Sequence, residues 1–131
     1  MLVAVCAAIG GAQAQIVPSL DVGNTTPVFD LLGRPLQGTW NFPETAARVE
    51  IRETTGGGGI APPDPVTGEG NDALNPLVRV TYMGAGVIGD NPGRFSANFP
   101  ERIDAAKRYY ARVYDAPSPS NAVYFANSAT F

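Results

Sequence analysis

The chain has 131 residues, of which 44% are hydrophobic and 16% charged, and its net charge is −3. This length suits one domain that is large enough to bury a core, and nine Lys and Arg scattered along an acidic chain offer no basic stripe to a nucleic acid. There is no His and a single Cys, which excludes Ser-His-Asp and Cys-His nucleophiles, His-ligated zinc and an intrachain disulfide.

The N-terminus has the apolar run and cleavage site of a secretory signal but lacks its basic n-region, and the alternative is a buried N-terminal strand or helix turn. An apolar run, Leu2–Gly11, is followed by Ala12-Gln13-Ala14, a site that signal peptidase would cleave before Gln15. We therefore predict a signal peptide over 1–14, a single domain over 15–131, and a location outside the cell or at its surface. Since no apolar run reaches 18 residues, no membrane span is expected.

Short stretches that alternate between apolar and polar residues recur along the chain, and Gly, Pro and Asn separate them. The predicted strands are Ile16–Leu20, Pro27–Leu31, Ala46–Thr54, Leu77–Met83, Arg94–Phe99, Arg108–Asp115 and Ala122–Phe131. About seven short strands with such turns predict an all-β fold, an antiparallel two-sheet sandwich, with a small barrel as the alternative.

The alternation also predicts which face of each strand is buried. In the strand over 46–54, Val49 and Ile51 share one face, while Arg48, Glu50 and Arg52 share the other. We expect the charged face to lie in solvent. The buried face is expected to form the core together with apolar residues of the other long strands, Val80 and Val113 among them.

The longest irregular stretch, Thr55–Pro76, is rich in Gly and Pro and is predicted to be a mobile loop. It carries the oxygen ligands that calcium prefers. The candidate calcium ligands are Asp64, Glu69, Asn71 and Asp72. Their spacing is not that of an EF-hand, and acidic surface loops are common, so we predict no metal or other cofactor.

The segment Tyr109–Ala116, YYARVYDA, resembles the penultimate strand of fibronectin type III and related immunoglobulin-like sandwiches. Tyr109, Ala111, Val113 and Ala116 match its pattern. The resemblance implies a tyrosine corner, in which the Tyr109 hydroxyl bonds to backbone upstream. More loosely, the chain resembles secreted bacterial β-sandwich modules of cell-surface proteins, which implies fold and location but no catalytic residues.

Aromatic residues supply one candidate binding face, because exposed rings can bind sugars or proteins. Its members are Trp40, Tyr110, Tyr114 and Tyr124. The alternative is that these rings pair across strands and stiffen the sheet.

These observations favour a non-enzymatic extracellular module with a structural or adhesive role, whose partner is another extracellular protein or a glycan. A carbohydrate-binding module is one alternative. Another is a filament subunit that self-assembles by strand addition, since the first predicted strands are short and marked by proline. A small glycosidase would need two carboxylates close together in a cleft.

Overall fold

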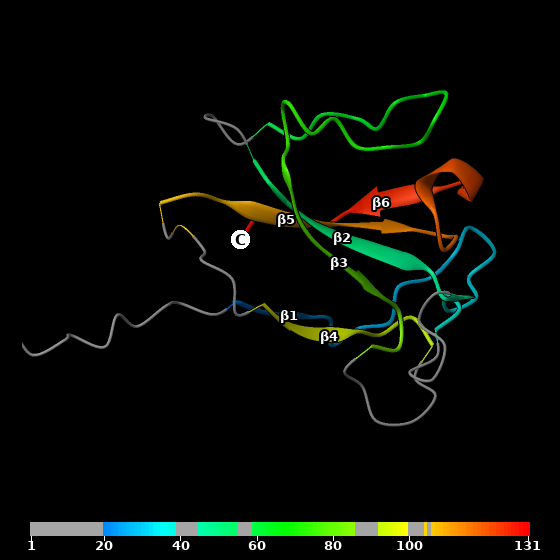
Figure 1. The fold of residues 1–131 in the computed structure, drawn as a ribbon. Helices are drawn as coiled ribbons and strands as arrows, with labels where there is room; N and C mark the ends of the chain where they lie inside the picture. The colour runs from blue at the N-terminus through cyan, green and yellow to red at the C-terminus, as the bar shows by residue number, and fades with distance from the viewer. Residues whose placement is uncertain (1–19, 39–44, 55–58, 86–91, 100–103, 105) are drawn as a thin grey trace, which may run out of the picture.

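The computed structural model describes residues 20–38, 45–54, 59–85, 92–99, 104 and 106–131. In this part of the chain, six strands form two antiparallel sheets (Figure 1). The larger sheet has the order β3 (Leu77–Tyr82), β2 (Arg48–Glu53), β5 (Tyr109–Tyr114), β6 (Phe125–Asn127). The smaller sheet pairs β1 (Leu20–Gly23) with β4 (Ser96–Phe99). An all-β fold of two antiparallel sheets is therefore confirmed.

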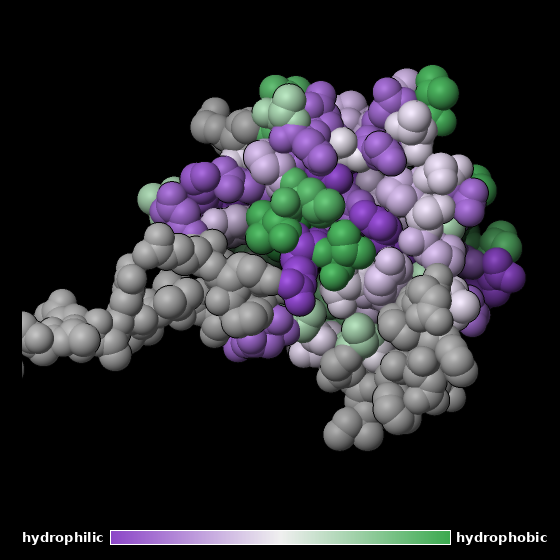
Figure 2. Space-filling view, viewed as in Figure 1, coloured by the Kyte–Doolittle hydropathy of each residue, from purple (hydrophilic) through white to green (hydrophobic). Residues whose placement is uncertain are grey.

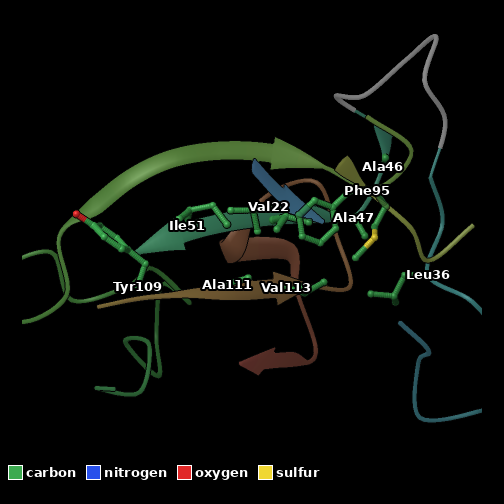
Figure 3. Packing of buried hydrophobic residues seen from close by; sticks show 11 residues of the cluster. Val22, Leu36, Ala46, Ala47, Ile51, Phe95, Tyr109, Ala111 and Val113 are labelled. Carbon is green, nitrogen blue, oxygen red and sulfur yellow. The ribbon is translucent and has the colours of Figure 1, made fainter. Parts of the chain in front are cut away.

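The hydrophobic core lies between the two sheets. Ile51 of β2 and Val113 of β5 pack in one cluster with Val22 of β1 and with Phe95, which precedes β4 (Figure 3). Val49 is fully buried in the same cluster. This face of β2 and β5 is the one that alternation predicts, because successive side chains of a strand point to opposite faces.

Tyr109, at the start of β5, is buried at one end of this core, and its hydroxyl is hydrogen-bonded to the backbone upstream of β5. Its hydroxyl accepts a hydrogen bond from the Asp104 N–H at 3.0 Å and lies 3.3 Å from the Asp104 carbonyl oxygen. The expected bond from the Tyr109 hydroxyl to upstream backbone is therefore present.

The second face of the larger sheet is covered by the loop that leads from β2 to β3. Figure 1 shows this loop on the side of the sheet opposite β1 and β4. Gly70 packs directly on the guanidinium of Arg52, and Gly68, at a φ of 71°, packs against the Pro119 carbonyl of the short 3-10 helix η2 (Pro119–Asn121). Residues 59–76 are thus docked on the sheet, and all six residues of β5 are buried.

The prediction that the charged face of β2 lies in solvent is wrong for two residues. Glu50 and Arg52 are only 1% and 3% exposed, because the docked loop covers them. Val80 pairs with Glu50 and so lies on this second face, whereas Thr81 is opposite Val49 and buried. Val80 is therefore not the core residue that we expected.

The strands of the second half of the chain lie where they were predicted, whereas the first two predicted strands are less regular. In place of a strand over 27–31, Phe29 forms an isolated bridge with Pro35. Of the strand predicted at 16–20, only Leu20 lies within the described residues, where β1 begins. The predicted signal peptide and Trp40 also lie outside them. No described helix has the length and apolar character of a membrane span.

Candidate functional site

The two sheets differ in width, and this leaves two strand edges facing the same space. Backbone hydrogen bonds alternate along an antiparallel pair. In β1 the bond from the Asn24 N–H to the Phe95 carbonyl, 3.3 Å, sets this alternation, so Asp21 and Gly23 direct their backbone groups away from β4. Among the described strands, none pairs with this second edge of β1.

The outer edge of β6 is equally open. Tyr124 accepts a hydrogen bond from the Asp115 N–H at 3.2 Å, and Ser128 donates one to Ala111 at 2.8 Å. By the same alternation, Phe125 and Asn127 direct their backbone groups away from β5. The described part of the chain provides no strand to pair with them.

Between these strands the core opens to the surface in a cavity of about 580 Å³. Core residues Val22, Phe95, Ala111 and Val113 form its floor, and Ala126 of β6 lies beside them. A cavity of this size is within the range of ligand sites and is unusually apolar for a surface feature. We name this feature the β1–β6 groove; its other lining residues are Asp21, Gly23, Asn24, Val28, Asn127, Ser128 and Phe131.

A smaller cavity of about 90 Å³ adjoins the groove, since both are lined by Val28, Val113 and Ala126. Its rim includes exposed hydrophobic residues of the segment after β1, of β6 and of the position just before β6. These are Phe29, Leu31, Tyr124 and Phe125. In the space-filling view, hydrophobic residues project at the edge of the molecule where the loop after β1 lies (Figure 2). Exposed apolar residues next to an opening in the core mark a surface suited to association.

The charged residues that line the two cavities are all acidic: Asp21, Asp30 and Asp115. Asp21 is exposed, and Asp115 accepts hydrogen bonds from two backbone N–H groups of the segment before β6. The N–H of Arg34 and that residue's guanidinium hold the pKa of Asp30 below its ordinary value. Arg34 thus compensates the charge of Asp30, whereas no described Lys or Arg forms an ion pair with Asp21 or Asp115, and these two carboxylates give the rim its negative charge.

A second notable cluster lies beneath the docked loop, on the other face of the sheet. Glu50 bridges two arginines, accepting from the Arg48 Nε at 2.9 Å and from the Arg52 Nε at 2.6 Å. Arg52 also donates to the loop, to the Asp72 carboxylate at 2.7 Å and the Asn75 carbonyl at 2.8 Å. Burial opposes the charge of Arg52, but the bonds to Asp72 and Glu50 raise its pKa above the ordinary value.

Arg112 is the second link between sheet and loop. Its Nη2 donates to the Ala61 carbonyl at 2.5 Å, and its Nε donates to the Asn127 side chain at 2.8 Å. Its guanidinium lies 5.5 Å from the ring centre of Tyr110 and 5.2 Å from that of Phe125. No described carboxylate forms an ion pair with it, and Arg112 Nη1 and the Tyr110 hydroxyl have no partner in the described part.

We name Arg48, Glu50, Arg52, Tyr110, Arg112 and Tyr114 the arginine layer. Tyr110 and Tyr114 are fully buried in it, so neither offers a ring face to solvent. This corrects the expected aromatic binding face, because the loop covers both rings. Of its described members, Tyr124 alone is exposed.

The structure does not bring all four candidate calcium ligands together: Asp64, Glu69 and Asn71 line one cavity of the loop, but the Asp72 carboxylate is bonded to Arg52. Asp64 accepts hydrogen bonds from the N–H groups of Val66 and Thr67, which lower its pKa, and Asp72 pairs with Arg52. Asn71 bonds to Leu74, and Glu69 lies across the loop from Asp64. Within the described residues no three acidic side chains come together.

Two carboxylates do line one cavity, of about 510 Å³, inside the loop: those of Asp64 and Glu69. A glycosidase needs one carboxyl group with a raised pKa to act as the acid. The pKa of Asp64 is lowered instead, because its carboxylate accepts those two backbone hydrogen bonds.

Neither the groove nor the arginine layer was predicted from the sequence. The strand alternation of β2 and β5 identifies which residues share a face, but not what covers that face. One signal was present: Tyr110 and Tyr114 flank Arg112 on the face that β5 turns away from the core.

No family model matches the chain, and neither curated proteins nor solved structures give a significant match.

Proposed function

We propose that this chain is a non-enzymatic extracellular β-sandwich module with a structural or adhesive role, and that it associates with another polypeptide through the β1–β6 groove. The observation that carries the proposal is the groove itself. It is lined by core residues and lies between two strands whose outer edges pair with no other strand in the described part of the chain. Such edges pair with strands of other chains.

Two further observations support the extracellular part. The pattern of an apolar run followed by Ala12-Gln13-Ala14 is typical of a secretory signal. The bond between the Tyr109 hydroxyl and the Asp104 backbone is the one that an immunoglobulin-like or fibronectin type III-like sandwich uses at its tyrosine corner.

Export is tested by expressing the chain in a secreting bacterial host. We expect mass spectrometry of the protein outside the cytoplasm to show an N-terminus at Gln15. Retention of the whole chain in the cytoplasm would contradict the extracellular proposal.

Association is tested by selecting short displayed peptides against the full chain. Ala126 is exposed and borders both cavities, so Ala126→Arg should block the groove without disturbing the core. The matched control is Val66→Arg, since Val66 is 89% exposed and lies in the loop on the opposite side of the sheet. Selected peptides should lose binding to the first variant and keep binding to the second. A selection that yields no peptide sensitive to Ala126→Arg would contradict the proposal.

A further inference from the structure

We infer that the free edge of β1 is the acceptor in this groove, and that its occupant is an extended segment of a partner protein with small apolar residues at alternate positions and Lys or Arg at its ends. The inference rests on the proposed association through the groove. It adds which strand receives the partner and what chemistry the partner has.

The unequal width of the sheets favours β1 over β6. The small sheet has two described strands and the large sheet four, so the floor residues Ala111, Val113 and Ala126 lie beside β1 with none of the described strands above them. A strand that paired with β1 would widen the small sheet and cover this floor. A strand that paired with β6 would extend the large sheet outward and leave the floor open.

The side chains of β1 set the pattern of the partner. Val22 points into the core, whereas Asp21 is exposed. Because side chains directly opposite each other in neighbouring strands share a face, every second residue of the partner would point into the groove with Val22. Those residues must be apolar, and β-branched ones suit a strand. The residues between them would face solvent with Asp21 and can be polar.

The negative charge of the rim predicts which charge the residues at the ends of the partner segment carry. Asp21 lies on the acceptor strand, Asp115 lines the adjoining cavity, and neither forms an ion pair with a described Lys or Arg. Asp30, which also lines that cavity, is paired with Arg34. Among the described residues, no Lys or Arg lines either cavity. Basic residues at the ends of the segment would complement this rim, and acidic ones would be repelled.

The experiment is a calorimetric titration of the full chain with the synthetic peptide Lys-Val-Thr-Val-Thr-Val-Lys. The key variant is Asp21→Pro, which removes the outward N–H of β1 but leaves the bonds from β1 to β4 in place, as proline at an edge position allows. The matched control is Asp21→Ala, which loses the same carboxylate and its bond from Asn98 but keeps the N–H. We expect Asp21→Pro to bind the peptide about tenfold more weakly than Asp21→Ala.

The outcomes separate this inference from the proposed function. If Asp21→Pro and Asp21→Ala bind the peptide equally well and Ala126→Arg does not bind it, the peptide binds in the groove but does not pair with the edge of β1. Equal affinity for a peptide with Glu in place of Lys overturns the basic partner. A fatty acid that binds the groove where this peptide does not overturns the strand partner. Light scattering tests whether a second copy of the chain is the occupant. An oligomer that persists in the presence of the peptide would show that it is, and would also overturn the strand partner. Unchanged peptide binding in Ala126→Arg contradicts the groove itself.

Discussion

Two neighbouring tyrosines of β5 show how one step along a strand changes what a side chain does. Tyr109 points into the hydrophobic core, and its hydroxyl bonds to the Asp104 backbone. Tyr110 points into the arginine layer, where its hydroxyl is buried without a partner among the described residues. A buried polar group that lacks a partner costs free energy, whereas one that is bonded does not.

This contrast predicts opposite effects for the same substitution. Tyr109→Phe should lower the free energy of unfolding by about 1 kcal/mol, because it leaves the Asp104 N–H without its acceptor. Tyr110→Phe should be neutral or should stabilise the fold by up to about 1 kcal/mol, because it removes an unpaired hydroxyl. Urea denaturation of both variants measures the two values. A larger loss for Tyr110→Phe than for Tyr109→Phe would show that the Tyr110 hydroxyl has a partner.

The same layer predicts a loss of stability at alkaline pH. Burial raises the pKa of the Tyr110 and Tyr114 phenols, and the negative charge of Glu50 adds to the shift of Tyr114. Because the folded state holds these protons more tightly than the unfolded state, their contribution is complete below about pH 10 and is lost as the pH rises above it.

We therefore expect the free energy of unfolding to fall as the pH rises above about 10, and to fall less in a chain carrying Tyr110→Phe and Tyr114→Phe. Urea denaturation across this range is the measurement. If the free energy of unfolding has the same pH dependence in the variant and the parent, the pKa values of Tyr110 and Tyr114 are not raised in the folded chain.

At the scale of elements, alternation in the sequence was enough to locate β2, β3 and β5 within one or two residues and to assign Val49, Ile51 and Val113 to the core. It failed for the second face, because period-two alternation of Arg and Glu has the same pattern whether water or a loop covers it. The predicted strand at Pro27–Leu31 also differs from the structure: an isolated Phe29–Pro35 bridge and backbone hydrogen bonds, such as that from the Leu36 N–H to the Val28 carbonyl, join it to the next segment without forming a regular strand.

Arg52 is one of the main residues that hold the loop 59–76 on the sheet, because it bonds to Asp72 and to the Asn75 carbonyl. Arg52→Ala would leave the buried Glu50 with Arg48 as its one arginine partner and would remove both bonds to the loop, so we expect a loss of about 3–5 kcal/mol in stability. The matched variant Asp72→Asn removes an ion pair whose carboxylate side chain is 71% exposed, and it should cost less than about 1 kcal/mol. Equal losses by chemical denaturation would contradict the role of Arg52.

The core assignment of β5 predicts that Val113→Asp unfolds the chain, because it buries an unpaired charge in the cluster with Val49 and Ile51. Val123→Asp, at a position that is 74% exposed, should leave the melting temperature within a few degrees of the parent. Circular dichroism on heating compares the two variants. A Val113→Asp chain that melts with the parent would mean that this face of β5 is not in the core.

At the scale of the whole molecule, the sequence predicts two sheets and an exposed edge, but not a groove. The groove depends on the difference in width between the sheets and on the position of β1 relative to β6, and both arise from pairing between distant segments such as Val22 and Ala97. Single residues such as Ala111 and Ala126 give no signal in the sequence that they will lie where the core opens.

Amide hydrogen exchange, measured by NMR on the full chain with and without the peptide Lys-Val-Thr-Val-Thr-Val-Lys, tests most directly whether a partner strand pairs with β1. We expect the amides of Asp21 and Gly23, which face the groove, to become protected when the peptide is bound, and those of Phe125 and Asn127 on the outer edge of β6 to keep exchanging as in the free chain. Protection of the β6 amides instead, or no new protection at either edge, would contradict a partner strand joined to β1.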